Sequence, residues 1–516
     1  MIETERKSQK IAHPTIIGVV AALWMSAAMF AHRLLFGIAS VPGLITIRII
    51  PFVPGNISGP ILGILGPFSK LVPELSALLA QLLVGAAAAA LYARTWGRPD
   101  APAWKRWAFG PLIGLGLWAL TLAALWPVLR ANFHGRPLAT GRALTIIAIF
   151  LDYLLFGALL PLLFLLARRA RTVEAGDTPT GAGAITRRHA VSFVGAGAVV
   201  AFGAFAFGLR RISTLGYDGH RPEPPVQPIT DNPSFYIVTN GLADPHVDAA
   251  VWQLAIGGDV ARPMTLSFDD LKALPAVDET TTLACIGNTL GGGLVSTARW
   301  HGVPLQSLID MAQPTPGVTE VFFTANDGYT NTVEFDKVAA EGMIVAYGMN
   351  DAPLSQRHGF PVRIITPGRY GEKNVKWVTR IDLRKRHTKG FYESQGWDRN
   401  AVVKTLARVD APAKGDAVTA GRPTTMRGIA FGGLRGVSKV EATMDGGATW
   451  TAATITAKPS PQSWALWELP WTPPASGPYK LGARCYEADG TLQPVKTEQN
   501  FPSGAAGIAF VTVVAT

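Results

Sequence analysis

Cysteine is scarce in this chain, which contains only two cysteines among its 516 residues. Cys285 and Cys485 lie far apart in the sequence, so there is no CxxC pair, no CxxCH haem-attachment motif and no spacing typical of zinc or iron–sulfur ligands. A disulfide between the two cysteines requires a fold that brings them together. These absences exclude a metal centre held by several clustered thiolates.

Charged residues are also few, at 16% of the chain, whereas apolar residues make up 48%. This composition is too apolar for an entirely soluble protein, and nearly all of the excess lies before residue 210. The formal net charge of +11 would suit a nucleic-acid partner, but many of the arginines flank apolar segments. Arginines in such places are typical of membrane topology signals, so we expect no nucleic-acid binding.

Apolar runs without any charge occur at residues 15–31, 75–93, 108–129 and 190–208. Each run is near the length that crosses a hydrocarbon core of roughly 30 Å, so each predicts a transmembrane helix. A fifth run, 143–167, contains Asp152, which suggests either a proton path at a quinone site or a helix-packing contact. The proline-broken stretch 32–72 contains re-entrant pieces or two more short spans. The prediction is therefore five spans, or seven.

Arginine and lysine are concentrated in two loops, one after residue 93 and one after residue 167. Because positive loops remain in the cytoplasm, we expect a multi-pass protein of the bacterial cytoplasmic membrane. Its C-terminal half is then extracytoplasmic, on the periplasmic side. Arg187 and Arg188 precede the last apolar run and resemble a twin-arginine export signal. An equally good interpretation is that the pair only determines topology.

Composition and periodicity divide the chain into a transmembrane domain, a proline-rich linker and two domains rich in short strands: 1–210, 211–230, 231–405 and 406–516. In the first of the two strand-rich domains, residues 343–349 and 360–368 are typical of buried strands bounded by turns. The second has short β-like runs joined by glycine and aspartate turns, as in a small all-β sandwich.

Cys285 lies in the stretch TTLACIGNTLGGG, between a short apolar run and a run of glycines. It could be a small buried hydrophobe, a nucleophile activated by His301 or His358, or a soft-metal ligand. Downstream, residues 357–381 crowd basic side chains around glycines: His358, Arg363, Arg369, Lys373 and Lys376. Such cations and turn amides form a cradle for a phosphate, although a solvated basic loop has the same composition.

Residues from about 225 to 515 resemble the sulfite oxidase family of molybdenum–pterin enzymes, including its membrane-linked bacterial relatives. The resemblance rests on the run CIGN, then GLVSTARWHGVPL, then HGFPVR, PGRYG and VKW. It implies a mixed α+β sulfite-oxidase-like molybdopterin domain followed by a C-terminal all-β immunoglobulin-like sandwich that mediates dimerisation. With the predicted spans, the expected fold begins with an N-terminal all-α transmembrane bundle.

The resemblance also implies a molybdenum–molybdopterin cofactor and assigns its ligands by position. Cys285 is expected to ligate molybdenum and to be the catalytic residue. The expected contacts to the pterin and its phosphate are Asn232, Tyr236, Ile237, Asp327, His358, Arg363, Asn374, Val375 and Lys376. Arg299 and Trp300 belong to the family signature and are expected to shape the pocket.

At three positions the chain departs from true sulfite oxidases, which surround the metal with arginines and a tyrosine. Ile237, Leu290 and Thr388 stand at those positions. Each charge-assisted hydrogen bond to an anion contributes on the order of 1.5–3 kcal/mol, so this loss weakens sulfite binding. We therefore expect a neutral small-molecule substrate, such as a sulfoxide, an N-oxide or a thioether, rather than sulfite.

Electrons must also reach or leave the expected metal centre. The chain has neither a fused haem domain nor histidines well inside its apolar runs, so the electron partner is expected to be a separate quinone or cytochrome. The remaining expected partners are membrane lipid and a second copy of the chain. The alternative hypothesis is a non-catalytic, transport-associated membrane protein whose exported half has lost its chemistry. Intact Cys285, His358, Arg363 and Lys376 favour the enzyme.

Overall fold

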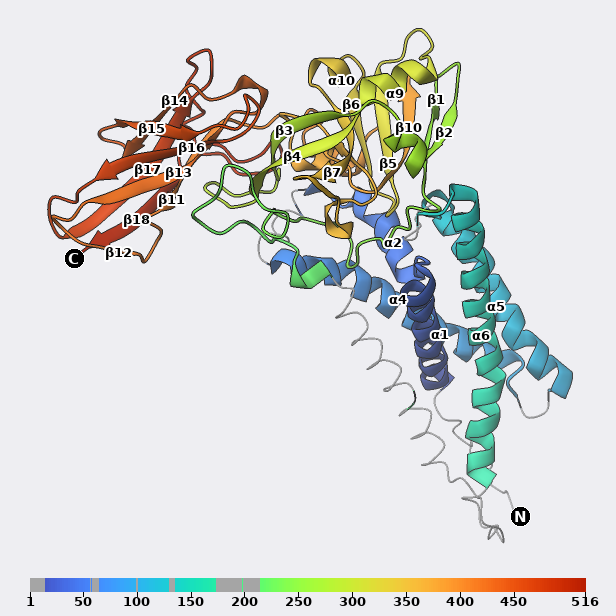
Figure 1. Ribbon diagram of the computed structural model, residues 1–516. Helices are drawn as coiled ribbons and strands as arrows, with labels where there is room; N and C mark the ends of the chain where they lie inside the picture. Colours follow the sequence, from blue (N-terminus) through green and yellow to red (C-terminus); the bar gives the residue numbers. More distant parts are fainter. Residues whose placement is uncertain are drawn as a thin grey trace. The chain divides into compact units, whose positions relative to one another are not determined.

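The computed structural model describes residues 14–55, 65–98, 101–129, 135–172 and 214–516, together with the single residues 57 and 197. The chain forms two compact units (Figure 1). The first comprises Met1–Ile50 and Lys70–Ser213, and the second comprises Pro51–Ser69 and Thr214–Thr516.

Apolar helices make up the first unit: α1 (Pro14–Phe36), α2 (Val41–Ile49), α4 (Leu71–Thr95), α5 (Ala103–Leu125), η3 (Trp126–Val128) and α6 (Leu138–Thr172). Four described stretches are long and apolar enough to cross a membrane: Pro14–Phe36, Phe68–Thr95, Ala103–Val128 and Leu138–Ala167. They match four of the five predicted spans. The fifth, 190–208, and the arginine pair before it lie outside the described residues. In the described part of 32–72, the remaining apolar helix, Val41–Phe52, is shorter than a span.

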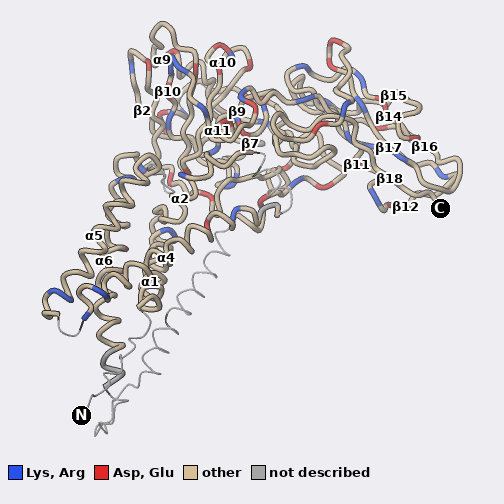
Figure 2. Tube along the Cα trace, turned by 180° about the vertical axis from the view of Figure 1, so that it is seen from behind, with Lys and Arg blue, Asp and Glu red and all other residues tan. Residues whose placement is uncertain are grey.

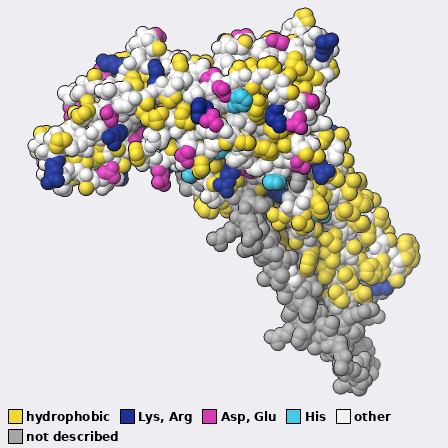
Figure 3. Space-filling view, viewed as in Figure 1, with side chains coloured by type: hydrophobic (Ala, Val, Ile, Leu, Met, Phe, Trp, Pro, Cys, Tyr) yellow, Lys and Arg dark blue, Asp and Glu magenta, His cyan; other side chains and the backbone are white. Residues whose placement is uncertain are grey.

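The surface of these helices agrees with a membrane-spanning role. Apolar side chains, yellow in Figure 3, gather on the face of this unit that the view shows, and in Figure 2 its helices carry little charge along their length. Two buried polar side chains of this unit lie close to a polar group on another helix. His32 Nδ1 lies 3.3 Å from Asp152 Oδ1, and Arg33 Nη1 lies 3.8 Å from Glu74 Oε1. Asp152 therefore has a partner on α1, which fits its helix-packing interpretation.

The second unit contains two five-stranded sheets (Figure 1). The first has the order β2 (Met264–Ser267), β1 (Gln253–Gly258), β10 (Val378–Arg384), β5 (Glu320–Ala325), β6 (Thr330–Glu334). The second has the order β3 (Val277–Ala284), β4 (Val295–Pro304), β7 (Ile344–Met349), β8 (Ala352–Pro353), with β9 (Arg363–Ile365) also paired to β7. All of these pairings are antiparallel except that of β1 with β10. Strands β7 and β9 fall within the runs predicted as strands from the sequence.

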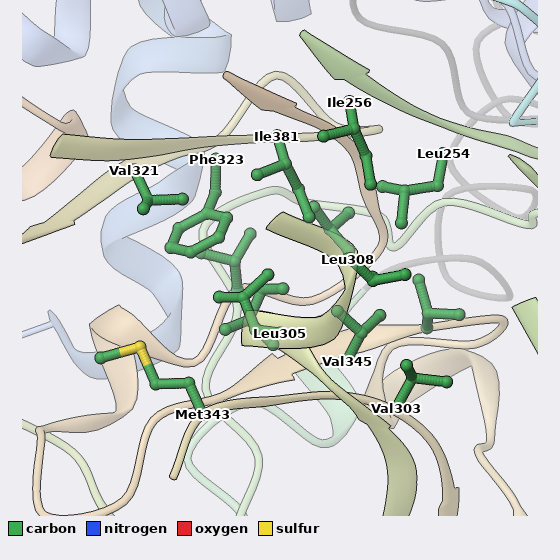
Figure 4. Close-up of a cluster of buried hydrophobic side chains, with 14 of the residues drawn as sticks. Leu254, Ile256, Val303, Leu305, Leu308, Val321, Phe323, Met343, Val345 and Ile381 are labelled. Atoms are coloured by element: carbon green, nitrogen blue, oxygen red, sulfur yellow. The ribbon is translucent and has the colours of Figure 1, made fainter. Parts of the chain in front are cut away.

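A hydrophobic core joins these sheets to helix α9 (Leu305–Ala312), as Figure 4 shows. Leu305, Leu308, Ile309 and Ala312 are all buried, at the i, i+3, i+4 and i+7 spacing of one helix face. They pack with strand residues such as Phe323 and Ile381. Burying a leucine of this kind stabilises the fold by roughly 1.5–3 kcal/mol. Three shorter helices complete this part: α8 (Phe268–Lys272), α10 (Lys337–Ala340) and α11 (Phe391–Ser394).

The last part of the chain is entirely β-rich. Its strands follow one hydrogen-bonded path: β11 (Leu406–Ala411), β13 (Thr424–Phe431), β16 (Ala465–Trp471), β15 (Thr451–Ala457), β14 (Lys439–Thr443), β17 (Gly477–Tyr486), β18 (Phe510–Ala515), β12 (Ala417–Val418). Cys485 is fully buried in the core between these strands, and both cysteines are free. The Trp464 backbone N–H donates to Thr282 Oγ1 at 2.7 Å, which ties this part to β3.

Residues 214–230, predicted as a linker, are held against the second unit by hydrogen bonds. The Thr214 N–H donates to Leu242 O at 2.8 Å, and the Gly219 N–H donates to Ile237 O at 2.8 Å. Trp464 Nε1 donates to Pro228 O at 2.9 Å. This proline-rich segment is therefore part of the second unit and is bonded to it near both of its ends.

Candidate active site

A cavity in the second unit collects most of the residues that the sequence singled out. Its empty volume is about 940 Å³, part of it open to solvent, which lies within the range of roughly 300–1,000 Å³ of small-molecule and cofactor sites. The predicted residues that line it are Tyr236, Ile237, Cys285, Asp327, His358, Arg363, Asn374, Val375 and Lys376. Nine of the ten predicted site residues, separated by up to 140 positions, therefore meet in one place.

Cys285 directly follows strand β3, and its loop fixes the backbone on both sides. The Cys285 N–H donates to Leu294 O, and Cys285 O accepts from the Asn288 N–H, both at 3.0 Å. Asn288 Oδ1 in turn accepts from the Leu294 N–H at 3.1 Å, which closes the glycine-rich loop. Burial raises the pKa of the Cys285 thiol to about 12, so without a metal the group is a neutral thiol.

The HGFPVR segment places His358 at the end of η5 (Gln356–His358) and Arg363 at the start of β9. Arg363 is 5% exposed, and its guanidinium donates to His358 O at 3.1 Å and to Asn374 O at 3.2 Å. Its Nε has no hydrogen-bond partner among the described residues. The guanidinium carbon lies 4.9 Å from the centre of the Trp300 ring, which holds the side chain in place.

The NVKW segment runs beside β9, because the Ile364 N–H donates to Val375 O at 2.8 Å. This pairing brings Arg363 and Lys376 opposite each other. Lys376 Nζ donates to Arg357 O at 3.1 Å and lies 4.2 Å from the centre of the Trp377 ring. Two motifs that are separate in the sequence thus present their cations to one cavity.

Asp327 and Tyr236 add polar groups, whereas Ile237 adds an apolar wall. Asp327 follows β5, and its Oδ1 accepts from the Tyr329 N–H at 2.9 Å. Burial raises the pKa of Asp327 to about 6 and raises the pKa of Tyr236 above its usual value. Asn232 does not line the cavity. Its carbonyl oxygen instead accepts from His358 Nε2 at 2.9 Å, so it orients a residue that does.

Of the three departures from the sulfite oxidase pattern, Ile237 alone lines the cavity, whereas Leu290 and Thr388 do not. Sequence reasoning also missed several residues of the cavity wall: Arg357, Glu372, Tyr392 and Trp397. Arg357 directly precedes the HGFPVR motif and Glu372 directly follows the PGRYG motif, so their positions in the sequence could have indicated that they line the cavity. Tyr392 and Trp397 lie in and after α11 and belong to no motif, so only the fold reveals them.

These residues fit a molybdopterin cofactor. Cys285 provides one soft sulfur ligand, as molybdenum–pterin chemistry requires of the protein. Arg357, Arg363 and Lys376 provide fixed cations for a phosphate, and the orphaned Arg363 Nε is a buried donor that a bound anion would satisfy. The Asp327 carboxyl is an acceptor for ring N–H groups. The fold and the cavity therefore define a molybdopterin-binding domain.

Comparison with known families agrees. Residues 241–392 match the family described as "Oxidoreductase molybdopterin binding domain". Residues 399–497 match the family described as "Mo-co oxidoreductase dimerisation domain". The chain therefore carries an oxidoreductase domain that binds the molybdenum cofactor, as the sequence motifs predicted.

Individual relatives identify the family. Sulfite oxidase of Gallus gallus is 30% identical over 327 residues, covering 53% of this chain and 70% of that protein. Mitochondrial sulfite oxidase of Homo sapiens is 30% identical over 54% of this chain and 61% of its own length. NADH nitrate reductase of Solanum lycopersicum is 29% identical over 50% of this chain and 36% of that protein. The chain belongs to the sulfite oxidase family, and it spans 57–61% of the length of the four mammalian mitochondrial enzymes named among its matches.

Among solved structures, the sulfane dehydrogenase SoxCD from Paracoccus pantotrophus aligns with a TM-score of 0.51 and 21% identity. The alignment covers 56% of this chain and 82% of the SoxCD chain. At that identity the likeness supports the fold of the second unit.

Proposed function

We propose that the protein is a membrane-anchored molybdopterin oxidoreductase whose catalytic unit lies on the extracytoplasmic side. Its reaction is a two-electron oxygen-atom transfer to or from a small neutral molecule. The observation that carries this proposal is the gathering of Cys285, Arg363, Lys376 and Asp327 around one cavity. A degenerate binding module has no need of a thiol placed beside cations and an acceptor in this way.

The side chains of the cavity divide the work of holding the cofactor. When bound, the cofactor supplies a molybdenum that exchanges two electrons and one oxygen atom with the substrate. Cys285 provides the protein thiolate, and because burial holds the pKa of its thiol at about 12, metal binding must displace this proton. Arg363 and Lys376 neutralise the phosphate, and Asp327 accepts hydrogen bonds from the pterin. His358, fixed by the Asn232 carbonyl, keeps the Arg363 segment in position.

The substrate part of the proposal rests on charge. The cations that line the cavity, Arg357, Arg363 and Lys376, come from the segment assigned to the cofactor. Ile237 stands at one of the positions where true sulfite oxidases carry arginines and a tyrosine. A dianion such as sulfite would lack several charge-assisted hydrogen bonds, each worth on the order of 1.5–3 kcal/mol. A sulfoxide, an N-oxide or a thioether needs no such bonds.

Two assembly features belong to the same proposal. The β-rich part from residue 406 onward is an immunoglobulin-like sandwich that pairs two copies of the chain, which the dimerisation-family match supports. The helices anchor the enzyme in the membrane lipid. A membrane quinone or a cytochrome exchanges electrons with the molybdenum.

Metal and cofactor analysis of the purified protein tests the core of the proposal. A preparation from a molybdenum-replete host is expected to contain about one molybdenum and one pterin per chain and to show no haem spectrum. An active preparation without molybdenum would refute the proposal.

A steady-state assay with an artificial electron acceptor or donor tests the substrate class. We expect weak or absent sulfite oxidation and measurable turnover of a dialkyl sulfoxide or an N-oxide. A micromolar apparent KM for sulfite, at the tight end of the usual enzyme range, would contradict the expected substrate class. It would mean that other cations, such as Arg299, Arg369 or Arg435, rebuild an anion site.

A further inference from the structure

Glu372 is a buried acid in the cavity wall that the cofactor assignment leaves unused. It is the middle residue of η6 (Gly371–Lys373) and lines the same cavity as Cys285. Its side chain is 8% exposed, and its Oε2 has no hydrogen-bond partner among the described residues. A buried carboxylate oxygen without a partner is costly, so its presence in a cavity indicates a partner that enters from outside.

The backbone at Glu372 is held by two hydrogen bonds and by close packing on the cavity wall. Glu372 O accepts from Tyr329 Oη at 2.8 Å and from Asn331 Nδ2 at 2.6 Å. On the other side, a Cβ atom at Gly371 would lie 2.6 Å from Tyr236 Oη, which shows how closely η6 packs against the cavity wall. The backbone from which the acid projects is therefore positioned by the fold.

The neighbouring cation does not form a hydrogen bond with this carboxyl. Lys373 Nζ donates to Asn331 Oδ1 at 2.8 Å and to Thr332 O at 3.0 Å. Burial raises the pKa of Glu372 to about 7, the Lys373 charge opposes this shift, and Asp398 and Glu393 add to it, so the carboxyl is mostly ionised above neutral pH. Burial is the main cause that raises the pKa of Cys285 and of Tyr392, and the charge of Glu372 adds to both shifts, so its field reaches the cavity.

We propose that Glu372 determines the charge of the substrate at the Cys285 cavity. Its carboxylate accepts a hydrogen bond from an N–H or O–H group of a neutral or cationic substrate, and it repels oxyanions. This inference rests on the proposed function and deepens it, because Ile237 stands where true sulfite oxidases carry an arginine or a tyrosine, and an acid also stands in the wall. The substrate class is then a small oxide that carries a hydrogen-bond donor.

Sulfate binding to the holoenzyme tests the repulsion without requiring turnover. Equilibrium titration at constant ionic strength and about pH 8.5, where Glu372 is ionised, compares the wild type with Glu372→Gln, which keeps the shape and removes the charge. We expect about tenfold tighter sulfate binding in Glu372→Gln. Glu279→Gln is the matched control, since Glu279 is a partly buried acid on β3 that does not line the cavity, and its sulfate affinity is expected to stay unchanged. Equal sulfate affinity in the wild type and Glu372→Gln would overturn the inference.

The hydrogen-bond role is tested with Glu372→Ala and two neutral sulfoxides, dimethyl sulfoxide and a hydroxyalkyl analogue. We expect kcat/KM to fall about tenfold for the hydroxyalkyl compound and less than threefold for dimethyl sulfoxide. An equal loss for both would reduce Glu372 to a structural role and overturn the inference. Molybdenum content and melting temperature confirm that each variant is loaded and folded.

The two arms separate this inference from the proposed function. Tighter sulfate binding by Glu372→Gln in an enzyme that reduces no neutral oxide would leave the assignment of Glu372 intact and refute the proposed reaction. Turnover of neutral oxides, together with equal sulfate affinity in the wild type and Glu372→Gln, would support the proposed reaction and refute the assignment of Glu372.

Discussion

At the scale of single residues, Cys285 is the clearest test of the cofactor assignment. Serine has a similar size, and the loop is held by backbone hydrogen bonds that do not involve the sulfur, so Cys285→Ser should fold normally. It offers a harder oxygen ligand, and we expect turnover to fall at least about 100-fold with the melting temperature nearly unchanged. Activity and melting are measured on the same preparation. Activity close to that of the wild type would show that this cysteine is merely structural.

Cys485 provides the matched cysteine variant. It is fully buried in the β-rich core, and its Sγ lies 3.3 Å from Leu406 O. It does not line the cavity that contains Cys285. Cys485→Ala leaves a small void, which should cost about 1 kcal/mol and lower the melting temperature by a few degrees. Molybdenum content and kcat should remain at wild-type values. A loss of molybdenum in this variant would mean that the β-rich part controls cofactor loading.

His358 predicts a pH dependence of stability. Burial lowers its pKa to about 4, whereas the unfolded chain keeps the ordinary value near 6.5. As the pH falls from about 6.5 to about 4, the unfolded chain binds a proton that the folded protein does not, so the free energy of unfolding decreases. The full effect is about 3 kcal/mol.

The measurement is the melting temperature of the wild type and of His358→Gln between pH 7 and pH 4. The advantage of the wild type should shrink as the pH falls, because only the wild type carries the buried imidazole. Asp327, whose pKa burial raises to about 6, acts in the opposite direction but is present in both proteins. A constant difference across this range would show that His358 titrates with the same pKa in the folded and unfolded protein.

At the scale of helices and strands, the sequence predicted what local patterns determine. The spans α1, α4, α5 and α6 were predictable because a charge-free apolar run has few alternatives to a membrane helix. Helix α6 runs from Leu138 to Thr172 and is longer than the predicted 143–167. The prediction followed the apolar run alone, whereas the helix also includes the polar and arginine-containing residues at its two ends. Boundaries of this kind depend on tertiary packing and water exposure, which hydropathy does not record.

Close glycine packing between α5 and α6 gives a prediction for the helical unit. A Cβ at Gly157 would lie 2.6 Å from Gly110 O and 2.8 Å from Pro111 Cα, so Gly157→Leu must push the two helices apart. Overpacking of this sort costs about 1–3 kcal/mol, and we expect a melting temperature several degrees lower in detergent. Gly116→Leu on α5 is the control, since nothing lies within 4 Å of its Cβ position. Equal melting temperatures for the two variants would contradict this helix pairing.

At the scale of the whole molecule, the site was predictable only in part. Cys285, His358, Arg363 and Lys376 belong to contiguous motifs whose chemistry is legible in the sequence, and the fold brings them to one cavity. Tyr392 and Trp397 reach that cavity from a segment about a hundred residues beyond Cys285, through contacts that no local pattern encodes. Glu372 directly follows the PGRYG motif, but its burial and its missing partner are properties of the packed structure.

Topology gives the last prediction. The four described spans are an even number, so they return the chain to its starting side at Thr172. The extracytoplasmic placement of the second unit therefore requires the predicted fifth span, 190–208, to cross the membrane as well. Cysteines introduced at two exposed positions can show on which side of the membrane each position lies. Arg98 follows the second described span, and the Asp269 side chain on α8 is 90% exposed.

Arg98→Cys and Asp269→Cys are treated in intact spheroplasts with a membrane-impermeant thiol reagent. We expect Asp269→Cys to be labelled at once and Arg98→Cys only after lysis. The wild type measures the background, which should be low because Cys485 is buried and Cys285 lies in the cavity wall. Labelling of Asp269→Cys only after lysis would place the catalytic unit in the cytoplasm. The arginine pair before residue 190 would then not serve export, and the electron partner would have to be a cytoplasmic one.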